Sequence, residues 1–244
     1  MFEYYYITAI LSAILLGFSK AGFKGIGFLV VTLMAVSFES KASTGILVPM
    51  LILADIFAIY YYRNDVNWPV LWKLFVPMAI GVFVGVFVGD KISVEVFKYA
   101  LAAITFFSAI MIVVMDRINA KKIPDGKAFA LIMGFGAGFC TMVGNLAGAF
   151  TNIYFLAMRF PKRAFIGTAA WLFFFINILK LPFHIFIWET INLESLKINL
   201  YLAPFIIIGF YIGLFLIEKV SNEAFKKYII VITIIGAFLI LLKG

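Results

Sequence analysis

The sequence predicts an all-α membrane protein, a polytopic helical bundle built as one domain over residues 1–244. Of the 244 residues, 65% are hydrophobic and only 13% are charged, and the mean hydropathy is +1.11. A water-soluble domain of this size could not bury so much apolar surface, so most of the protein must face lipid. Six apolar runs also approach the roughly 20 residues that a spanning helix needs. We therefore expect a multi-pass protein of the cell membrane.

Four further apolar runs are too short to span comfortably, and they form two adjacent pairs, one opening each half of the chain. Each pair could be two tilted crossings, or a re-entrant hairpin whose tip meets the other tip near the middle of the membrane. The lengths favour hairpins, so we expect eight to ten membrane segments including two short broken or re-entrant pairs. The apolar runs cover residues 3–18, 25–38, 43–62, 70–89, 97–115, 128–143, 146–158, 165–188, 198–217 and 225–242.

The two halves of the chain resemble each other, which predicts an internal duplication of residues 3–116 and 127–243. Asp90–Lys98 aligns with Glu218–Lys226, with five identical residues in register. Transporter folds are commonly built from two such repeats of inverted topology. The same arrangement is expected here.

Glycines spaced four residues apart occupy matching places in the two halves. Gly81 and Gly85 in the first half align with Gly209 and Gly213 in the second. Small residues at this spacing let helix backbones approach closely within a membrane. We therefore expect these glycines at helix–helix contacts.

The distribution of lysine and arginine predicts the orientation. Loops 116–127 and 159–163 are the richest in these residues, and basic loops stay on the cytoplasmic side. Counting outward from them places loops 63–69 and 218–227 inside and loop 90–98 outside. The two halves then have opposite topology. Because the basic residues lie mostly in these loops, the net charge of +8 reflects membrane orientation and does not indicate nucleic-acid binding.

The two expected hairpin tips are rich in glycine and contain polar side chains. The helix that follows each tip begins with unpaired N–H groups and the positive end of its dipole, which attract anions. Lys20 and Lys24 beside such ends would form an anion site; alternatively, both are ordinary charges of a cytoplasmic loop. The candidate anion-binding residues at the tips are Ser19, Lys20, Gly22, Lys24, Gly144, Asn145, Thr151 and Asn152.

Segment 165–188 places three polar residues on one helical face, at Asn177, Lys180 and His184. Lys180 lies deep in the segment, so it either binds a ligand or pairs structurally with Asp55, or does both. Asp55 aligns with Asn177 and is the only acid within a predicted span. It is a candidate for proton coupling or simply the charge partner of a lysine. His184 is either a further ligand or an ordinary histidine near the membrane interface.

Motifs for catalysis are missing, which argues against an enzyme. The chain has no G-x-S-x-G, H-E-x-x-H or phosphate-binding loop. With one histidine and one cysteine, Cys140, it cannot form a disulfide within the chain, and a His/Cys metal site is not expected. We expect no cofactor and no metal.

Several of these features resemble the sulfite exporter TauE/SafE family of membrane anion transporters. The resemblance covers essentially the whole chain and rests on the duplicated Gly-rich openings and on the patterns Lys41–Gly45 and Arg163–Gly167. Its most specific piece is the run FPKRAFIGTAAWLFFFINILKLPFH, residues 160–184. It implies export of sulfite or short organosulfonates such as sulfoacetate across a prokaryotic cell membrane.

The resulting hypothesis is a carrier that works by alternating access. The anion would bind at mid-membrane between the two tips and the polar face of segment 165–188, with Lys20, Asn145, Asn177 and Lys180 as its main partners. The alternatives are a passive anion channel and a membrane assembly subunit that transports nothing. The expected partners are a small anion and membrane lipids, without nucleic acid, and a homo-oligomer is compatible with the sequence.

Overall fold

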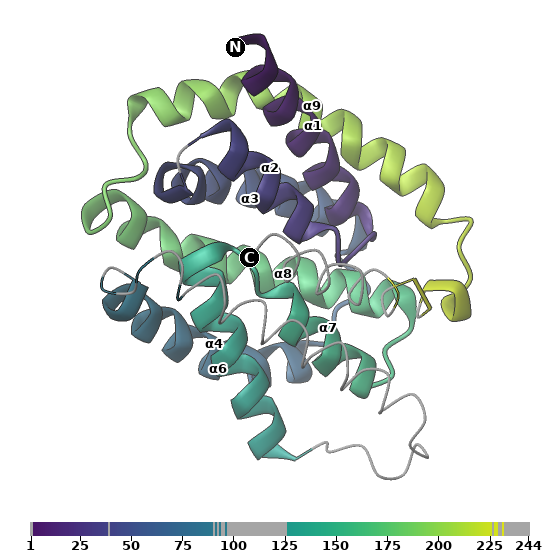
Figure 1. Cartoon of the computed structure of the whole chain (residues 1–244). Helices are drawn as coiled ribbons and strands as arrows, with labels where there is room; N and C mark the ends of the chain where they lie inside the picture. Colours follow the sequence, from purple (N-terminus) through teal and green to yellow (C-terminus); the bar gives the residue numbers. More distant parts are fainter. Residues whose placement is uncertain are drawn as a thin grey trace.

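The computed structural model describes residues 2–38, 40–89 and 126–225, together with the single residues 91, 93, 96, 227, 228 and 231. Every regular element in these residues is an α-helix (Figure 1). The predicted segment 97–115, the basic loop 116–125 and most of segment 225–242 lie outside the described residues. The helices are α1 (Phe2–Ala21), α2 (Gly27–Ser37), α3 (Ser40–Tyr62), α4 (Trp68–Gly89), α6 (Lys127–Gly144), α7 (Gly148–Ala157), α8 (Lys162–Phe186) and α9 (Leu193–Ile217).

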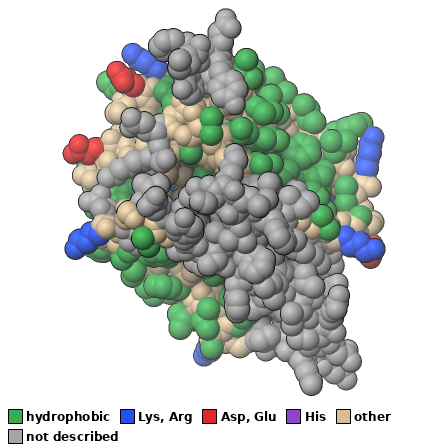
Figure 2. All heavy atoms as spheres, in the orientation of Figure 1, with side chains coloured by type: hydrophobic (Ala, Val, Ile, Leu, Met, Phe, Trp, Pro, Cys, Tyr) green, Lys and Arg blue, Asp and Glu red, His purple; other side chains and the backbone are tan. Residues whose placement is uncertain are grey.

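Within the described chain, five helices are long and apolar enough to cross a bilayer: α3 from Ala42 onward, α4, α6, α8 and α9. Large apolar side chains such as Phe87 on α4 and Leu200 on α9 point outward, where a soluble protein would place polar ones. In the described part of the surface that Figure 2 shows, hydrophobic side chains are widespread and the charged ones lie near the margins of the view. The predicted multi-pass membrane fold is confirmed.

Each predicted short pair consists of one long and one short helix. α1 has 20 residues and α2 has 11, while α6 has 18 and α7 has 10. At 1.5 Å per residue the short arms extend about 15–17 Å, roughly half the hydrocarbon core of a bilayer. α2 folds back along α1, where the Ser12 hydroxyl donates to the Val30 carbonyl oxygen at 3.0 Å. The short arms therefore have the length expected of a re-entrant hairpin, whereas the long arms α1 and α6 approach spanning length.

The long arm of each hairpin packs against a spanning helix through glycines. α1 lies beside α9, and a Cβ atom added at Gly209 would be 2.0 Å from the Ile14 carbonyl oxygen. α6 lies beside α4, and a Cβ atom added at Gly81 would be 2.2 Å from the Phe135 carbonyl oxygen (Figure 1). These backbones therefore touch, and the packing role predicted for the glycine faces is confirmed.

α3 and α8 pack together at the centre and run in opposite directions. A Cβ atom added at Gly45, near the start of α3, would be 2.3 Å from the Thr190 carbonyl oxygen, just beyond the end of α8. At the other end, a Cβ atom added at Gly167 would be 2.8 Å from the Tyr62 carbonyl oxygen. The middles of both helices consequently face each other in the interior of the protein.

Three of the connections predicted to share one side of the membrane meet at one end of this helix pair. Arg163, in the predicted loop 159–163, forms an ion pair with Asp65 in the loop after α3, with Nη2 and Oδ2 3.1 Å apart. The Lys162 ammonium donates to the carbonyl oxygens of Ile217 and Val220, at 2.8 and 2.6 Å. The common side predicted for these loops is therefore confirmed, while its assignment to the cytoplasm stays a prediction.

The two hairpin tips point toward opposite ends of α3. Beside the first tip, the Tyr62 hydroxyl donates to the Ala21 carbonyl oxygen at 2.8 Å. At the second tip, the Asn145 amide donates to the Thr44 carbonyl oxygen at 3.2 Å. Thr44 and Tyr62 are about five turns apart, or about 27 Å along the helix. The expectation that the tips meet at the middle is wrong, because the long arms α1 and α6 both extend past it.

Candidate functional site

A buried carboxylate lies where α3 crosses α8. Asp55 is 0% exposed, and both of its oxygens accept hydrogen bonds. Oδ1 accepts from the Lys20 ammonium at 2.6 Å, and Oδ2 accepts from the Asn177 amide at 3.0 Å. The carboxylate is therefore fully engaged by one residue from α1 and one from α8.

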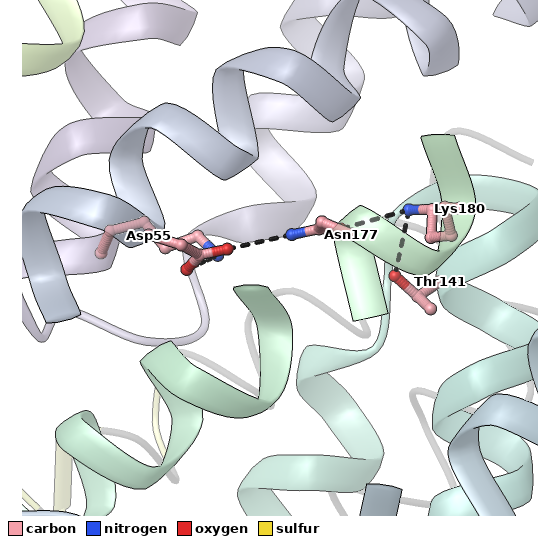
Figure 3. Close-up of polar contacts among 5 residues, drawn as sticks. Asp55, Thr141, Asn177 and Lys180 are labelled. Atoms are coloured by element: carbon pink, nitrogen blue, oxygen red, sulfur yellow. Dashed lines mark hydrogen bonds and ion pairs between the residues drawn. The ribbon is translucent and has the colours of Figure 1, made fainter. Parts of the chain in front are cut away.

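A second buried ammonium group lies on the far side of Asn177. Lys180, also 0% exposed, donates to the Asn177 side-chain oxygen at 3.5 Å, one turn away on α8. It also donates to the Asn145 side-chain oxygen at 2.5 Å and to the Thr141 hydroxyl at 3.4 Å. Figure 3 shows Asn177 between Asp55 on one side and Lys180 on the other, with Thr141 beyond Lys180.

These contacts form one continuous chain from the first hairpin to the second. It passes from Lys20 through Asp55, Asn177 and Lys180 to Asn145. We call these five residues the polar chain. Four of them were predicted from sequence as anion-binding residues, and Asp55 as a charge partner or coupling residue. The structure therefore places the strongest candidates in direct succession.

The direct pairing of Lys180 with Asp55, one of the two roles considered for this lysine, is not what the structure shows. Asp55 forms its ion pair with Lys20, and Asn177 separates it from Lys180. The reason is that α1 extends past the middle of α3 and brings Lys20 to the depth of Asp55. Each residue had more than one possible partner, and sequence spacing could not choose among them.

Lys20 and Lys24 are interior residues, so the alternative of ordinary loop charges is wrong. Their exposed fractions are 6% and 5%. The Lys24 ammonium has no carboxylate or hydrogen-bond acceptor in contact among the described residues. It lies 6.0 Å from the centre of the Phe173 ring, and the Lys20 ammonium lies 4.9 Å from the same ring. The ring face offers a weak electrostatic contact to both cations.

Two residues of this region, Phe173 and Thr141, were not predicted. Phe173 belongs to a run of three phenylalanines, and nothing in the sequence distinguishes it from its neighbours. Thr141 precedes Gly144 and Asn145 in the second Gly-rich tip, so its polarity there was an available signal. Phe173 lies on α8, the helix of Asn177 and Lys180, and Thr141 lies on α6, which ends one residue before Asn145.

The remaining candidates lie near the polar chain without belonging to it. Thr151 donates to the carbonyl oxygens of Ala147 and Gly148, within its own helix. Gly22 has a φ of +147°, which favours glycine at this turn. Asn152 is buried on α7. Ser19 and Gly144 are buried at the ends of the long arms α1 and α6.

The N-termini of the two short helices are available for polar contacts. Neither α2 nor α7 has a side chain that caps its first turn, although the Leu29 N–H group of α2 donates to the Ile26 carbonyl oxygen at 2.9 Å. A Cβ atom added at Gly27 or Gly148, the first residue of each helix, would have no described atom within 4 Å. Each short helix thus begins with the positive end of its dipole and with no described atom against its first residue, and anion binding there stays a prediction.

His184 lies one turn beyond Lys180 and is fully buried. Its Nδ1 is 2.8 Å from the Thr190 hydroxyl, and its ring packs edge-on against Trp188 with the centroids 5.1 Å apart. Its Nε2 has no hydrogen-bond partner among the described residues. His184 therefore contacts the loop after α8 and stands outside the polar chain.

Comparison with known proteins gives one match. The family model described as sulfite exporter TauE/SafE matches residues 9–240, which include both hairpins and the whole polar chain. No curated protein and no solved structure matches the chain. Because the matched region covers nearly the entire sequence, the chain belongs to the TauE/SafE family, a family of membrane exporters of sulfite and related anions.

Proposed function

We propose that this protein is a carrier that exports small sulfur-containing oxyanions, either sulfite or short organosulfonates such as sulfoacetate. The observation that supports this most is the excess of buried cations. Lys20, Lys24 and Lys180 are buried, while Asp55 is the one buried acid among the described residues. An anion that enters this region would supply the missing negative charge.

The physical reason is the cost of burying an uncompensated charge. A buried ammonium group without a counterion is strongly destabilising unless it is paired or loses its proton. Lys180 is satisfied only by neutral oxygens, and Lys24 only faces an aromatic ring. A bound oxyanion could replace the neutral partners of Lys180 and give Lys24 an acceptor. The uncapped N-termini of α2 and α7 and the amide of Asn152 would supply further donors.

Alternating access between two inverted repeats is the mechanism we propose, and three structural relationships support it. The aligned residues Asp55 and Asn177 contact each other at the α3–α8 crossing. α1 packs on α9 as α6 packs on α4, through glycines that align between the halves. The hairpin tips point to opposite ends. Rocking of one repeat against the other would expose the site to each side in turn.

A passive anion channel is the main competing function. In a channel, the charged residues would line an open path, and flux would not saturate. Here the five residues of the polar chain hydrogen-bond to one another in succession across the middle of the protein. This arrangement favours a carrier, because its contacts must rearrange in every transport cycle.

The test is transport by the purified protein in proteoliposomes. Uptake of ³⁵S-sulfite and of labelled sulfoacetate should saturate with concentration and accelerate when unlabelled anion is present on the opposite side. Lys180→Gln should lower the rate by at least about tenfold, because it removes a charge that the anion would otherwise contact. Lys73→Gln, at an exposed position on α4, is the matched control.

The outcomes of this experiment separate the candidate functions. Saturable, trans-stimulated uptake supports a carrier, whereas flux that rises linearly and ignores the opposite side indicates a channel. Absence of flux and of anion binding would favour an assembly subunit. Unchanged uptake in Lys180→Gln would overturn the assignment of the site.

A further inference from the structure

We infer that the site selects small oxyanions with two negative charges over otherwise similar anions with one. This inference rests on the proposed function and specifies the substrate class of the same site. It follows from the number of buried charges and from their pairing, which together set the charge that a bound anion must supply.

The charge of the site follows from its ionisable residues. Within the described chain, the buried charged residues are Lys20, Lys24, Lys180 and Asp55, and the one histidine of the chain is counted as neutral. With all three lysines protonated, three cations and one anion give a net charge of +2. A dianion would reduce this to zero, whereas a monoanion would leave one cation uncompensated in a low-dielectric interior.

The pairing shows which cations remain for the substrate. Lys20 is already neutralised, because its ammonium lies 2.6 Å from Asp55. The second oxygen of that carboxylate is occupied by Asn177. Asp55 is thus engaged on both sides and leaves Lys24 and Lys180 without a carboxylate partner among the described residues.

The two remaining cations belong to different elements. Lys24 lies in the tip of the first hairpin beside Phe173, and Lys180 lies on α8 beside Asn145 of the second tip. A dianion in this region would match the two uncompensated charges in number, whereas a monoanion would match only one of them.

A matched pair of substrates tests this inference. Sulfoacetate is a dianion at neutral pH, and its methyl ester retains the sulfonate and a similar length but has one negative charge fewer. In proteoliposomes, the wild-type protein should transport sulfoacetate with a kcat/KM at least about tenfold higher than the ester, because a full buried charge differs between the two complexes. Equal or better transport of the ester would overturn the inference and leave the proposed function intact. Failure to transport either compound or sulfite would overturn the proposed function itself.

Variants that change the net charge provide the internal control. Lys24→Gln and Lys180→Gln each lower the site charge to +1, and each should reduce the preference for sulfoacetate by about tenfold or more. The double variant Lys20→Gln, Asp55→Asn removes the existing ion pair and keeps the net charge at +2. Whatever its effect on the rate, its preference should stay close to that of the wild type. A preference that falls equally in all three variants would show that net charge does not set specificity.

A binding measurement keeps the inference testable where a variant transports poorly. Isothermal titration calorimetry of the detergent-purified variants gives the ratio of dissociation constants for the same two compounds. A variant is included only if it elutes as the wild type does in size-exclusion chromatography. The preference for sulfoacetate in this ratio should fall in Lys24→Gln and in Lys180→Gln, and it should stay close to the wild-type value in the double variant. A ratio that is the same in every correctly folded variant would contradict the inference.

Discussion

The amide of Asn177 donates to the carboxylate of Asp55 at 3.0 Å across a separation of 122 residues. This separation equals the offset at which the two halves of the sequence align around α3 and α8. A contact between equivalent positions is what a two-fold relationship between repeats produces at its axis. The polar chain extends from this contact into both hairpins.

Removing the Asn177 amide should destabilise the protein, because it leaves an oxygen of Asp55 and a donor of Lys180 without partners. We expect Asn177→Leu to lower the free energy of unfolding by about 1–3 kcal/mol, the cost of a buried unsatisfied polar group. The measurement is the thermal midpoint of the purified protein in detergent. Asn199→Leu is the control, since both polar atoms of that amide lack partners among the described residues. Equal losses in the two variants would contradict the role assigned to Asn177.

Neutralising Asp55 alone should be more costly than neutralising the whole ion pair. Asp55→Asn leaves the buried Lys20 ammonium without a counterion, and we expect a loss of about 3–5 kcal/mol. Adding Lys20→Gln should recover part of it, so the double variant should be more stable than the single one. A double-mutant cycle on thermal unfolding measures this coupling. Additive losses would show that the two residues do not interact energetically.

A methyl group in the interface between α4 and α6 should separate these helices. A Cβ atom at Gly138 would lie 1.8 Å from the Met78 carbonyl oxygen, so Gly138→Ala requires a backbone shift. We expect destabilisation of at least about 1–3 kcal/mol, seen as a lower thermal midpoint or a smaller folded fraction in size-exclusion chromatography. Gly126→Ala should be tolerated, because a Cβ atom there meets no described atom within 4 Å. Similar behaviour of both variants would argue against the close packing of α4 and α6.

Labelling of single cysteines in whole cells should reveal the orientation. In a Cys140→Ala background, Asp65→Cys and Asn222→Cys should react only after the cells are permeabilised, because their end of the protein holds the basic loops. Glu194→Cys, exposed at the opposite end of α9, should react with an impermeant maleimide in intact cells. The reverse pattern would invert the predicted orientation, and labelling of Asp65→Cys and Asn222→Cys from different sides would contradict the fold.

The sequence by itself determined that the protein lies in a lipid membrane, that it is helical, and which residue types form its candidate anion site. Apolar runs of spanning length and glycines four residues apart are local patterns, and their consequences do not depend on which helices become neighbours. A polar group within the membrane is costly whichever helices become its neighbours. The sequence could therefore single out the candidate residues Lys20, Asp55, Asn177 and Lys180.

Only the tertiary structure decided how these residues are paired. Lys20 reaches Asp55 because α1 extends past the middle of α3, and Asn177 then separates Asp55 from Lys180. Phe173 and Thr141 enter the site because of where α8 and α6 pack. Hydropathy and spacing describe residues along one helix, whereas a pairing depends on how deeply each hairpin inserts and on how α3 and α8 cross. Those depths result from packing over the whole bundle, so they could not be read from any single segment.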